Sequence, residues 1–240
     1  MISIIIPTLN EEKVIENTLK SLRQLKDYAY EIIVADGGSR DKTVEIAKKN
    51  YAKVVIHKGP TTQTISSNRN LGASIAIGDF FVFVDAGVVI PDINNFFKKT
   101  LSLFSNQQKL VGLSVRIKVF PEVETLSDKI FFTLDNYNLF VSNNILGLGK
   151  ASGKFQMIKA SVFKKLQGYN ENIVVCEDIE LFQRLAREGK TRIEMSLKVL
   201  HSGRRAHKIG WPKLLLKWWI NGMSVTFFKR SFDTIWEEIR

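Results

Sequence analysis

The feature that most constrains the fold is an alternation of strand and helix patterns over the first ninety residues. Continuous apolar runs, rich in β-branched residues, predict strands at residues 2–6, 31–35, 54–56 and 79–84. Residues with helical spacing follow the first three runs. Strands that alternate with helices indicate a mostly parallel sheet, and strands that are apolar throughout need helices on both faces of that sheet. The sequence therefore predicts an α/β fold.

Two of these predicted strands end at a carboxylate, Asp36 after the second and Asp85 after the fourth. Ligands of open parallel sheets bind beyond the carboxyl ends of the strands, so both residues are candidates for a site. The nearby loops also carry helix-start signals, because Thr8 and Glu11 match a capping box and Ser39 fits an N-cap. A tight strand-to-helix turn is the simpler interpretation of the loop after Asp36.

The second half of the chain shows a different pattern. An apolar stripe predicts a helix over residues 93–104, and strict alternation over residues 111–119 predicts a half-buried strand. A second stripe marks a long amphipathic helix and consists of Leu126, Ile130, Leu134, Tyr137 and Val141. After a glycine-rich loop at residues 147–153, we expect a strand near 155–158, helices from about Ser161 and Glu177, and one or two strands over 191–200.

The charge of the chain points to an anionic partner, because its formal net charge is +11. From Lys198 onward, nine basic residues against three acidic ones leave +6 in the last part of the chain. Apolar residues lie among these cations, including Trp211, Leu214, Leu215, Trp218 and Phe228. The pattern predicts a basic amphipathic helix at an anionic membrane surface. Packing of the same residues on the rest of the domain is the alternative.

Three further signals concern location. The apolar stretch at residues 214–228 contains Lys217 and is shorter than the ~20 residues that a membrane span needs. The start of the chain has no basic segment ahead of its apolar run, so we interpret it as a buried strand rather than a signal peptide. The single cysteine, Cys176, cannot form an internal disulfide. These signals predict a cytoplasmic protein, located at the inner face of the cell membrane where its basic helix binds lipid.

Four ordered blocks of residues carry a resemblance to a known family. They lie at residues 4–12, 31–43, 69–86 and 168–185. The blocks include Pro7-Thr8-Leu9-Asn10-Glu11, Asp36-Gly37-Gly38-Ser39, Val84-Asp85-Ala86 and Glu177-Asp178-Ile179-Glu180. In this order and spacing they resemble the family-2 glycosyltransferases, over roughly residues 1–200.

The resemblance implies a GT-A type fold and an inverting transfer of a sugar from a nucleotide-diphosphate sugar. The residues that it places around the nucleotide are Pro7, Thr8, Glu11, Asp36 and Arg69. It places Asp85 and Ala86 beside the ribose and the diphosphate, and makes Asp178, next to Glu177, the general base. Taken by themselves, Glu177 and Asp178 are also typical of first-turn acids that complement a helix dipole.

An organisation and a set of partners follow from the resemblance and the tail. We expect a catalytic domain at residues 1–200, with a nucleotide-binding half at about 1–90 and an acceptor half at 91–200, and then a basic amphipathic segment at 201–240. The expected partners are a nucleotide-diphosphate sugar, an acceptor for which a polyprenyl-linked lipid is one candidate, and a peripheral membrane surface. Nucleic acid is not expected, because the charge lies in a tail and no familiar binding motif is present.

One departure from the family pattern concerns metal. The usual motif is Asp-any-Asp, whereas this chain has Asp85-Ala86-Gly87, and Gly87 has no side chain to act as a ligand. Three outcomes stay open: Mg²⁺ or Mn²⁺ held by Asp85 with the diphosphate and His201, cationic side chains in place of the metal, or loss of activity. Arg204 and Arg205 resemble the basic segment that closes over the diphosphate in related transferases, although a solvated basic loop fits them equally well.

Two rival functions follow from the same observations. The missing second acid is consistent with an inactive glycosyltransferase-like scaffold. A nucleotidyltransferase on a similar fold is less favoured, because the sequence lacks a Gly-rich loop bearing Arg or Lys after its first strand.

Overall fold

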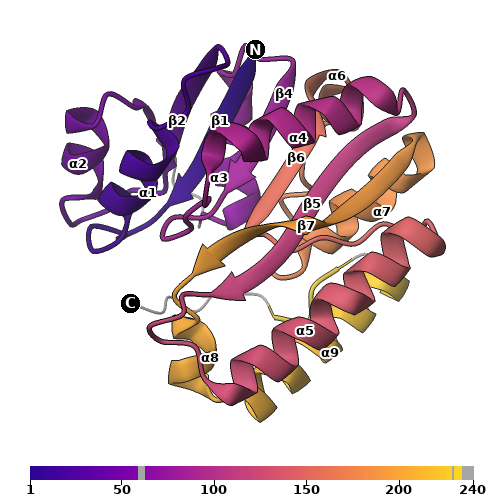
Figure 1. Cartoon of the computed structure of the whole chain (residues 1–240). Coiled ribbons are helices and arrows are strands. Elements are labelled where there is room, and N and C mark those ends of the chain that lie inside the picture. Colours follow the sequence, from indigo (N-terminus) through magenta and orange to yellow (C-terminus); the bar gives the residue numbers. More distant parts are fainter. Residues whose placement is uncertain (59–62, 229, 234–240) are drawn as a thin grey trace.

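The computed structural model describes residues 1–58, 63–228 and 230–233. Over these residues, seven strands form one sheet in the order β3-β2-β1-β4-β6-β5-β7 (Figure 1). Their bounds are β1 Ile2–Thr8, β2 Tyr30–Asp36, β3 Lys53–Ile56, β4 Phe80–Val84, β5 Leu110–Val119, β6 Phe155–Lys159 and β7 Lys190–His201. Only the pairs that include β6 are antiparallel. The predicted α/β fold with a mostly parallel sheet is confirmed.

Helices pack on both faces of this sheet. Their bounds are α1 Ile15–Leu22, α2 Thr43–Lys49, α3 Ile65–Ser74, α4 Ile93–Asn106, α5 Leu126–Phe140, the π-helical turn η1 Val141–Ile145, α6 Ala160–Lys165, α7 Glu177–Glu188, α8 Arg204–Ile209 and α9 Trp211–Phe228. On one face, Ile4 shares a core with residues of α1 and α4. On the other face, Ile5 shares a core with residues of α3, α6 and α7. Side chains alternate along a strand, so an apolar strand needs both layers.

The predicted helix-start signals near residues 8 and 39 are wrong. Thr8 is the last residue of β1, and its hydroxyl donates to Asp36 Oδ2 at 2.9 Å. The helix α1 begins only at Ile15, after an N-cap at Val14, and α2 follows an N-cap at Lys42. The hydroxyl of Ser39 also donates to Asp36 Oδ2. The side chains predicted as caps are therefore used to satisfy a buried carboxylate at the end of β2.

The helix predicted over residues 126–141 is present as α5 and η1, but its apolar stripe faces outward. Leu126 is 73% exposed and Leu134 is 64% exposed. The inward face contains Asn136, whose amide group bonds both the N–H and the carbonyl of Ile117 at 2.9 Å. A satisfied hydrogen-bonding pair can replace an apolar contact in a core. An apolar stripe therefore predicted the helix correctly and its buried face wrongly.

Two strand predictions for the second half also change. The strand β5 was expected to be half-buried, but it is buried from Leu110 to Val115, and only its last part alternates, with Lys118 exposed. The helices that cover β5 are α4, α5 and α7. Residues 191–200 form one strand, β7, which pairs with β5 in parallel and shifts register after Val115.

The last helix, α9, is attached to the domain through part of its apolar face. Leu214 is buried, and the indole N–H of Trp211 donates to Asp128 Oδ1 at 3.0 Å. The ring of Phe131 on α5 contacts both Trp211 and Trp218, so α5 and α9 lie side by side (Figure 1). Trp211, Leu214 and Trp218 therefore pack on the rest of the domain, which was the alternative to membrane binding in the sequence analysis.

No helix among the described residues combines the length and the apolar character that crossing a bilayer would require. The proposed division of the chain at residues 90 and 200 stays a prediction.

We expect Gly72→Val to lower the free energy of unfolding by about 1–3 kcal/mol, because overpacking a tight helix–strand contact strains the core. A Cβ atom at Gly72 would lie 2.5 Å from Ile5 Cγ2 and 3.2 Å from Ala35 Cβ. Urea denaturation of both variants measures the effect, with Ser74→Val, exposed on the same helix, as the matched control. Equal stability of the two variants would contradict close packing of α3 on β1.

Candidate functional site

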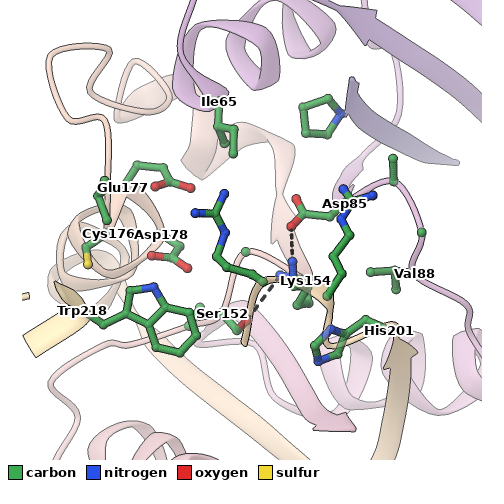
Figure 2. A pocket seen from close by; sticks show the side chains of 18 of the residues that line it. Ile65, Asp85, Val88, Ser152, Lys154, Cys176, Glu177, Asp178, His201 and Trp218 are labelled. Atoms are coloured by element: carbon green, nitrogen blue, oxygen red, sulfur yellow. Dashed lines mark hydrogen bonds and ion pairs between the residues drawn. The ribbon is translucent and has the colours of Figure 1, made fainter. Parts of the chain in front are cut away.

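A cavity of about 360 Å³ lies at the carboxyl ends of β1 and β4. It is bordered by the end of β1, the loop after β4, the loop before β6, the start of α7, and the segment from His201 through α8 to α9. The residues predicted for the site that line it are Pro7, Thr8, Glu11, Asp85, Ala86, Glu177, Asp178, His201, Arg204 and Arg205. Figure 2 shows Glu177 and Asp178 on one side of it and Asp85, Lys154 and His201 on the other.

Asp36 lies behind the wall of this cavity and is fully buried. Its carboxylate accepts hydrogen bonds from the backbone N–H groups of Gly38 and Ser39 at 2.9 and 2.8 Å. It also accepts hydrogen bonds from the hydroxyl groups of Thr8 and Ser39. A carboxylate with this many internal donors is already satisfied. Asp36 therefore holds the loop after β2 in shape, and its contact with a base or ribose stays a prediction.

Arg69 is also buried behind the cavity wall, with 1% of its surface exposed. Its guanidinium donates to Glu177 Oε1 at 2.7 Å, Asp85 Oδ1 at 2.9 Å and the carbonyl of Gly153 at 3.1 Å. It also lies over the ring of Tyr169, at 5.2 Å from the ring centre. The planar fork of arginine suits this multiple bonding. Arg69 therefore connects three parts of the site, and its contact with a nucleotide stays a prediction.

The carboxylate of Asp85 has both oxygens engaged. Oδ1 accepts from Arg69, and Oδ2 accepts from the ammonium of Lys154 at 2.9 Å. Burial alone would raise the pKa of Asp85, but the charges of Lys154 and Arg69 hold that pKa below its ordinary value. Asp85 is therefore ionised and paired with two cations.

His201 was considered as a second metal ligand. Its Nδ1 accepts the N–H of Gly203 at 3.1 Å, so a neutral ring carries its proton on Nε2. Burial, helped by the charge of Lys154, lowers the pKa of His201 to about 3, which keeps the ring neutral. In this tautomer Nε2 carries its proton and is not available as a metal ligand.

The residues of the cavity do not fit a divalent ion. Gly87 has a φ of 82°, which explains why glycine stands where related chains have an acid. Over the part of the chain that the structure describes, no group of three or more His, Cys, Asp or Glu could hold a metal. Hard divalent ions favour several oxygen ligands, and here the one candidate carboxylate is already paired.

The acidic side of the cavity is formed by the first residues of α7. Burial and the neighbouring negative charge of Glu177 raise the pKa of Asp178 to about 7. Glu177 is held by Arg69, whereas Asp178 lines the cavity and accepts from its own helix through the N–H of Ile179. Acids that only complement the helix dipole do not require burial next to a second carboxylate, which is the environment of Asp178. Asp178 is thus suited to accept a proton near neutral pH.

Arg204 and Glu11 form a close pair across the cavity mouth. Nη2 of Arg204 lies 2.6 and 2.8 Å from the two carboxylate oxygens of Glu11. Arg204 is half-buried and is the first residue of α8, so a solvated basic loop is the wrong description of it. The pair connects the loop after β1 to the segment after β7.

Three charged residues of the cavity, Asp135, Lys150 and Lys154, were not predicted from the sequence. Lys150 lies in the glycine-rich loop at residues 147–153, and Lys154 lies between that loop and the predicted strand. Asp135 lies on α5, where burial raises its pKa to about 6. One sequence feature could have identified Asp135. It lies on the side of α5 opposite the apolar stripe, and that side lines the cavity. Nothing in the sequence pattern around Lys154 pairs it with Asp85.

Comparison with known proteins decides the family. A family model described as "Glycosyl transferase family 2" matches residues 3–167, which is more than half of the chain. The chain belongs to glycosyl transferase family 2. The predicted family is confirmed, and the match covers the first three of the four sequence blocks.

Among curated relatives, this family-2 chain is 31% identical over 232 residues to the 4,4'-diaponeurosporenoate glycosyltransferase of Staphylococcus haemolyticus, covering 89% of this chain and 60% of the relative. It is 27% identical over 203 residues to the succinoglycan biosynthesis protein ExoA of Rhizobium meliloti, covering 78% and 58%. The chain thus spans about 60% of the length of these relatives.

The fold is shared with solved structures. The mannosyltransferase PcManGT from Pyrobaculum calidifontis, in complex with GDP-Man and Mn²⁺, matches with a TM-score of 0.67 and 15% identity. The match covers 84% of this chain and 56% of that one. The predicted GT-A fold is confirmed.

We expect Arg69→Met to lower the free energy of unfolding at neutral pH by about 3–5 kcal/mol, because it leaves the buried carboxylate of Glu177 without its partner and Asp85 with one cation instead of two. The loss should shrink at low pH. Arg69 helps to lower the pKa of Asp85, and the stability that comes from a lowered pKa is present above the ordinary value and is lost as pH falls through the folded pKa.

The double variant Arg69→Met/Glu177→Gln should recover part of the loss, because it removes the carboxylate that Arg69→Met leaves without a partner. Denaturant titrations at several pH values measure both effects. A deficit below about 1 kcal/mol, as is typical of exposed ion pairs, would contradict the bridging role of Arg69.

Proposed function

We propose that this family-2 chain transfers a sugar from a nucleotide-diphosphate sugar to an acceptor hydroxyl, with inversion at the anomeric carbon. One observation carries the proposal: a single cavity at the carboxyl edge of the sheet has cations on one side and Asp178, with its raised pKa, on the other. The first set suits a leaving diphosphate and the second suits a general base.

The donor belongs on the side formed by β1 and β4. Pro7 and Thr8 end β1 there, and Asp85 and Ala86 follow β4. This is the position at which open α/β sheets bind nucleotides. Lys154 and Arg205 also line the cavity and bring positive charge to it. The GDP-Man complex of the structurally similar mannosyltransferase supports a nucleotide sugar as the donor.

The proposed chemistry is a single displacement. The acceptor hydroxyl gives its proton to Asp178 as its oxygen attacks the anomeric carbon. The bond from that carbon to the diphosphate oxygen breaks, and its electron pair stays on the diphosphate, which leaves as the nucleoside diphosphate. Attack from the face opposite the leaving group inverts the anomeric centre. Because Asp85 is already paired with Arg69 and Lys154, the side-chain cations of the cavity carry the leaving-group charge.

We further propose a lipid-linked acceptor and a peripheral position at the inner face of the cell membrane. Trp219, Phe227 and Phe228 on α9 are 64%, 71% and 71% exposed. The outward stripe of α5 adds Leu126 and Leu134. Both helices also border the cavity, so a bilayer against them would bring a lipid acceptor to its mouth.

We expect Asp178→Asn to lower kcat by about 10²–10⁴-fold, because it removes the base but little volume. Donor affinity should be kept. Transfer of labelled sugar and calorimetric titration of the donor measure the two quantities separately. Retained turnover in the variant would exclude Asp178 as an essential base. Loss of donor binding would show that Asp178 contacts the donor rather than the acceptor.

The pH dependence of the wild-type chain provides a second test of the same group. Transfer should rise with pH up to about 7 and then level, because only the ionised carboxylate accepts a proton. The ionisation of Asp178 raises the transfer rate but lowers the stability of the folded chain. Since the folded pKa lies above the ordinary value of 3.8, the contribution of Asp178 to stability is present below that value and lost as pH rises through about 7. Asp178→Asn should therefore be the more stable protein above pH 7, and a pH-independent rate would contradict the assignment.

We expect the triple variant Trp219→Gln/Phe227→Gln/Phe228→Gln to bind vesicles of phosphatidylcholine and phosphatidylglycerol at least about tenfold more weakly than the wild-type chain, since each ring would lose burial in the interface. Co-sedimentation measures the binding. The matched control is Tyr51→Gln/Ile77→Gln, which removes exposed apolar residues 82% and 70% accessible from another part of the surface. Equal pelleting of both variants would rule out α9 as the membrane contact.

A further inference from the structure

Lys154 occupies the place on Asp85 where a metal ion would have to bind. Its ammonium lies 2.9 Å from Asp85 Oδ2, while Arg69 holds Oδ1 at the same distance. The carboxylates of Asp85 and Glu177 are paired with Arg69 and Lys154, and Asp178 lies close by as a third acid. A divalent ion at Oδ2 would have to displace Lys154 and would bring two positive charges next to Arg69. Both oxygens of Asp85 are therefore paired without a metal.

Lys154 also has hydrogen-bonding capacity left for a ligand. An ammonium group has three N–H donors, and the described residues give this one a single partner, Asp85 Oδ2. The side chain is 36% exposed and lines the cavity. Two donors and a positive charge thus face the space in which a leaving diphosphate would lie.

His201 adds a neutral donor on the same side of the cavity, as Figure 2 shows. The residue is 8% exposed, and among the described residues its Nε2 is buried without a hydrogen-bond partner. Since Nδ1 accepts the N–H of Gly203, Nε2 carries the proton. A buried donor without a partner is rare in folded proteins and indicates a missing acceptor. A phosphate oxygen supplies such an acceptor.

Arg204 is less suited to the same task. Both oxygens of Glu11 lie within 2.8 Å of its Nη2, so its charge is already offset by a nearby carboxylate. The sequence had suggested that Arg204 and Arg205 compensate for the missing acid at Gly87. The contacts favour Lys154 for the main part of that role, because it is paired with Asp85 and also lines the cavity.

We propose that Lys154, assisted by the Nε2–H of His201, takes the place of the divalent metal ion and binds the diphosphate of the nucleotide, so that nucleotide binding by this chain needs no metal. This inference rests on the proposed function. During transfer, the electron pair of the broken sugar–oxygen bond stays on the diphosphate, and Lys154 stabilises the added negative charge.

Calorimetric titration of the whole chain with UDP and, separately, with GDP tests the inference. Each nucleotide is titrated in EDTA and then in Mn²⁺. We expect one of them to bind with the same affinity in both solutions. Lys154→Ala should bind it about 10- to 100-fold more weakly in EDTA, since a charged hydrogen-bonded partner of the diphosphate is lost.

The variant should also gain a response that the wild-type chain lacks. Removing Lys154 frees Asp85 Oδ2, so Mn²⁺ should restore nucleotide affinity to Lys154→Ala. Lys154→Arg keeps the charge and should bind in EDTA more tightly than Lys154→Ala. The matched control is Lys20→Ala, which removes a lysine from an exposed pair with Glu16 and should behave as the wild-type chain. A purely structural role for Lys154 would lower the melting temperature without creating a response to Mn²⁺.

The outcomes separate this inference from the function on which it rests. Nucleotide binding by the wild-type chain only in Mn²⁺, or unchanged binding by Lys154→Ala in EDTA, would overturn the role of Lys154 and leave the proposed transfer standing. If the folded chain binds neither nucleotide in either solution, the proposed function itself fails and the inference fails with it.

Discussion

The arrangement of this site depends on one buried guanidinium, that of Arg69. It donates to oxygens of Asp85, Glu177 and Gly153, which come from the end of β4, the start of α7 and the loop before β6. These segments lie far apart in the sequence, and the geometry of the cavity depends on their common partner. The charge of Arg69 also affects the pKa values of neighbouring carboxyl groups. Arg69 helps to lower the pKa of Asp85, and its charge partly offsets the burial and the charge of Glu177 that raise the pKa of Asp178.

Much of this architecture could be predicted from the sequence, because its signals are local. The apolar runs that became β1, β2 and β4 are continuous, and a strand of that kind is stable only between two layers of helices. The positions of Asp36 and Asp85 at strand ends followed from the same runs. Asp178 was assigned from the resemblance, and the structure supplies the physical reason, which is burial beside Glu177.

The parts that could not be predicted depend on partners distant in the sequence. Thr8 and Ser39 have the chemistry of helix caps, yet both serve the carboxylate of Asp36, a choice that only the paired strands reveal. The stripe of α5 looked like a buried face, but Asn136 bonds β5 from the other side and turns the stripe outward. Lys154 carries no local pattern, and its role depends on Asp85, a carboxylate that follows β4 and is distant in the sequence. Spacing identifies elements, whereas burial and charge pairing across the sheet identify the working residues.

The central claim is that the cavity binds a nucleotide-diphosphate sugar. The most direct measurement is the melting temperature of the chain with a panel of UDP-, GDP- and dTDP-sugars, each with Mn²⁺ and with EDTA, and with ATP as the comparison. The account predicts a saturable rise with one sugar nucleotide, since a ligand at 100 times its Kd adds about 2.7 kcal/mol to the stability of the folded state. ATP should give a smaller rise. No rise with any sugar nucleotide in either solution, or an equal rise with ATP, would contradict it.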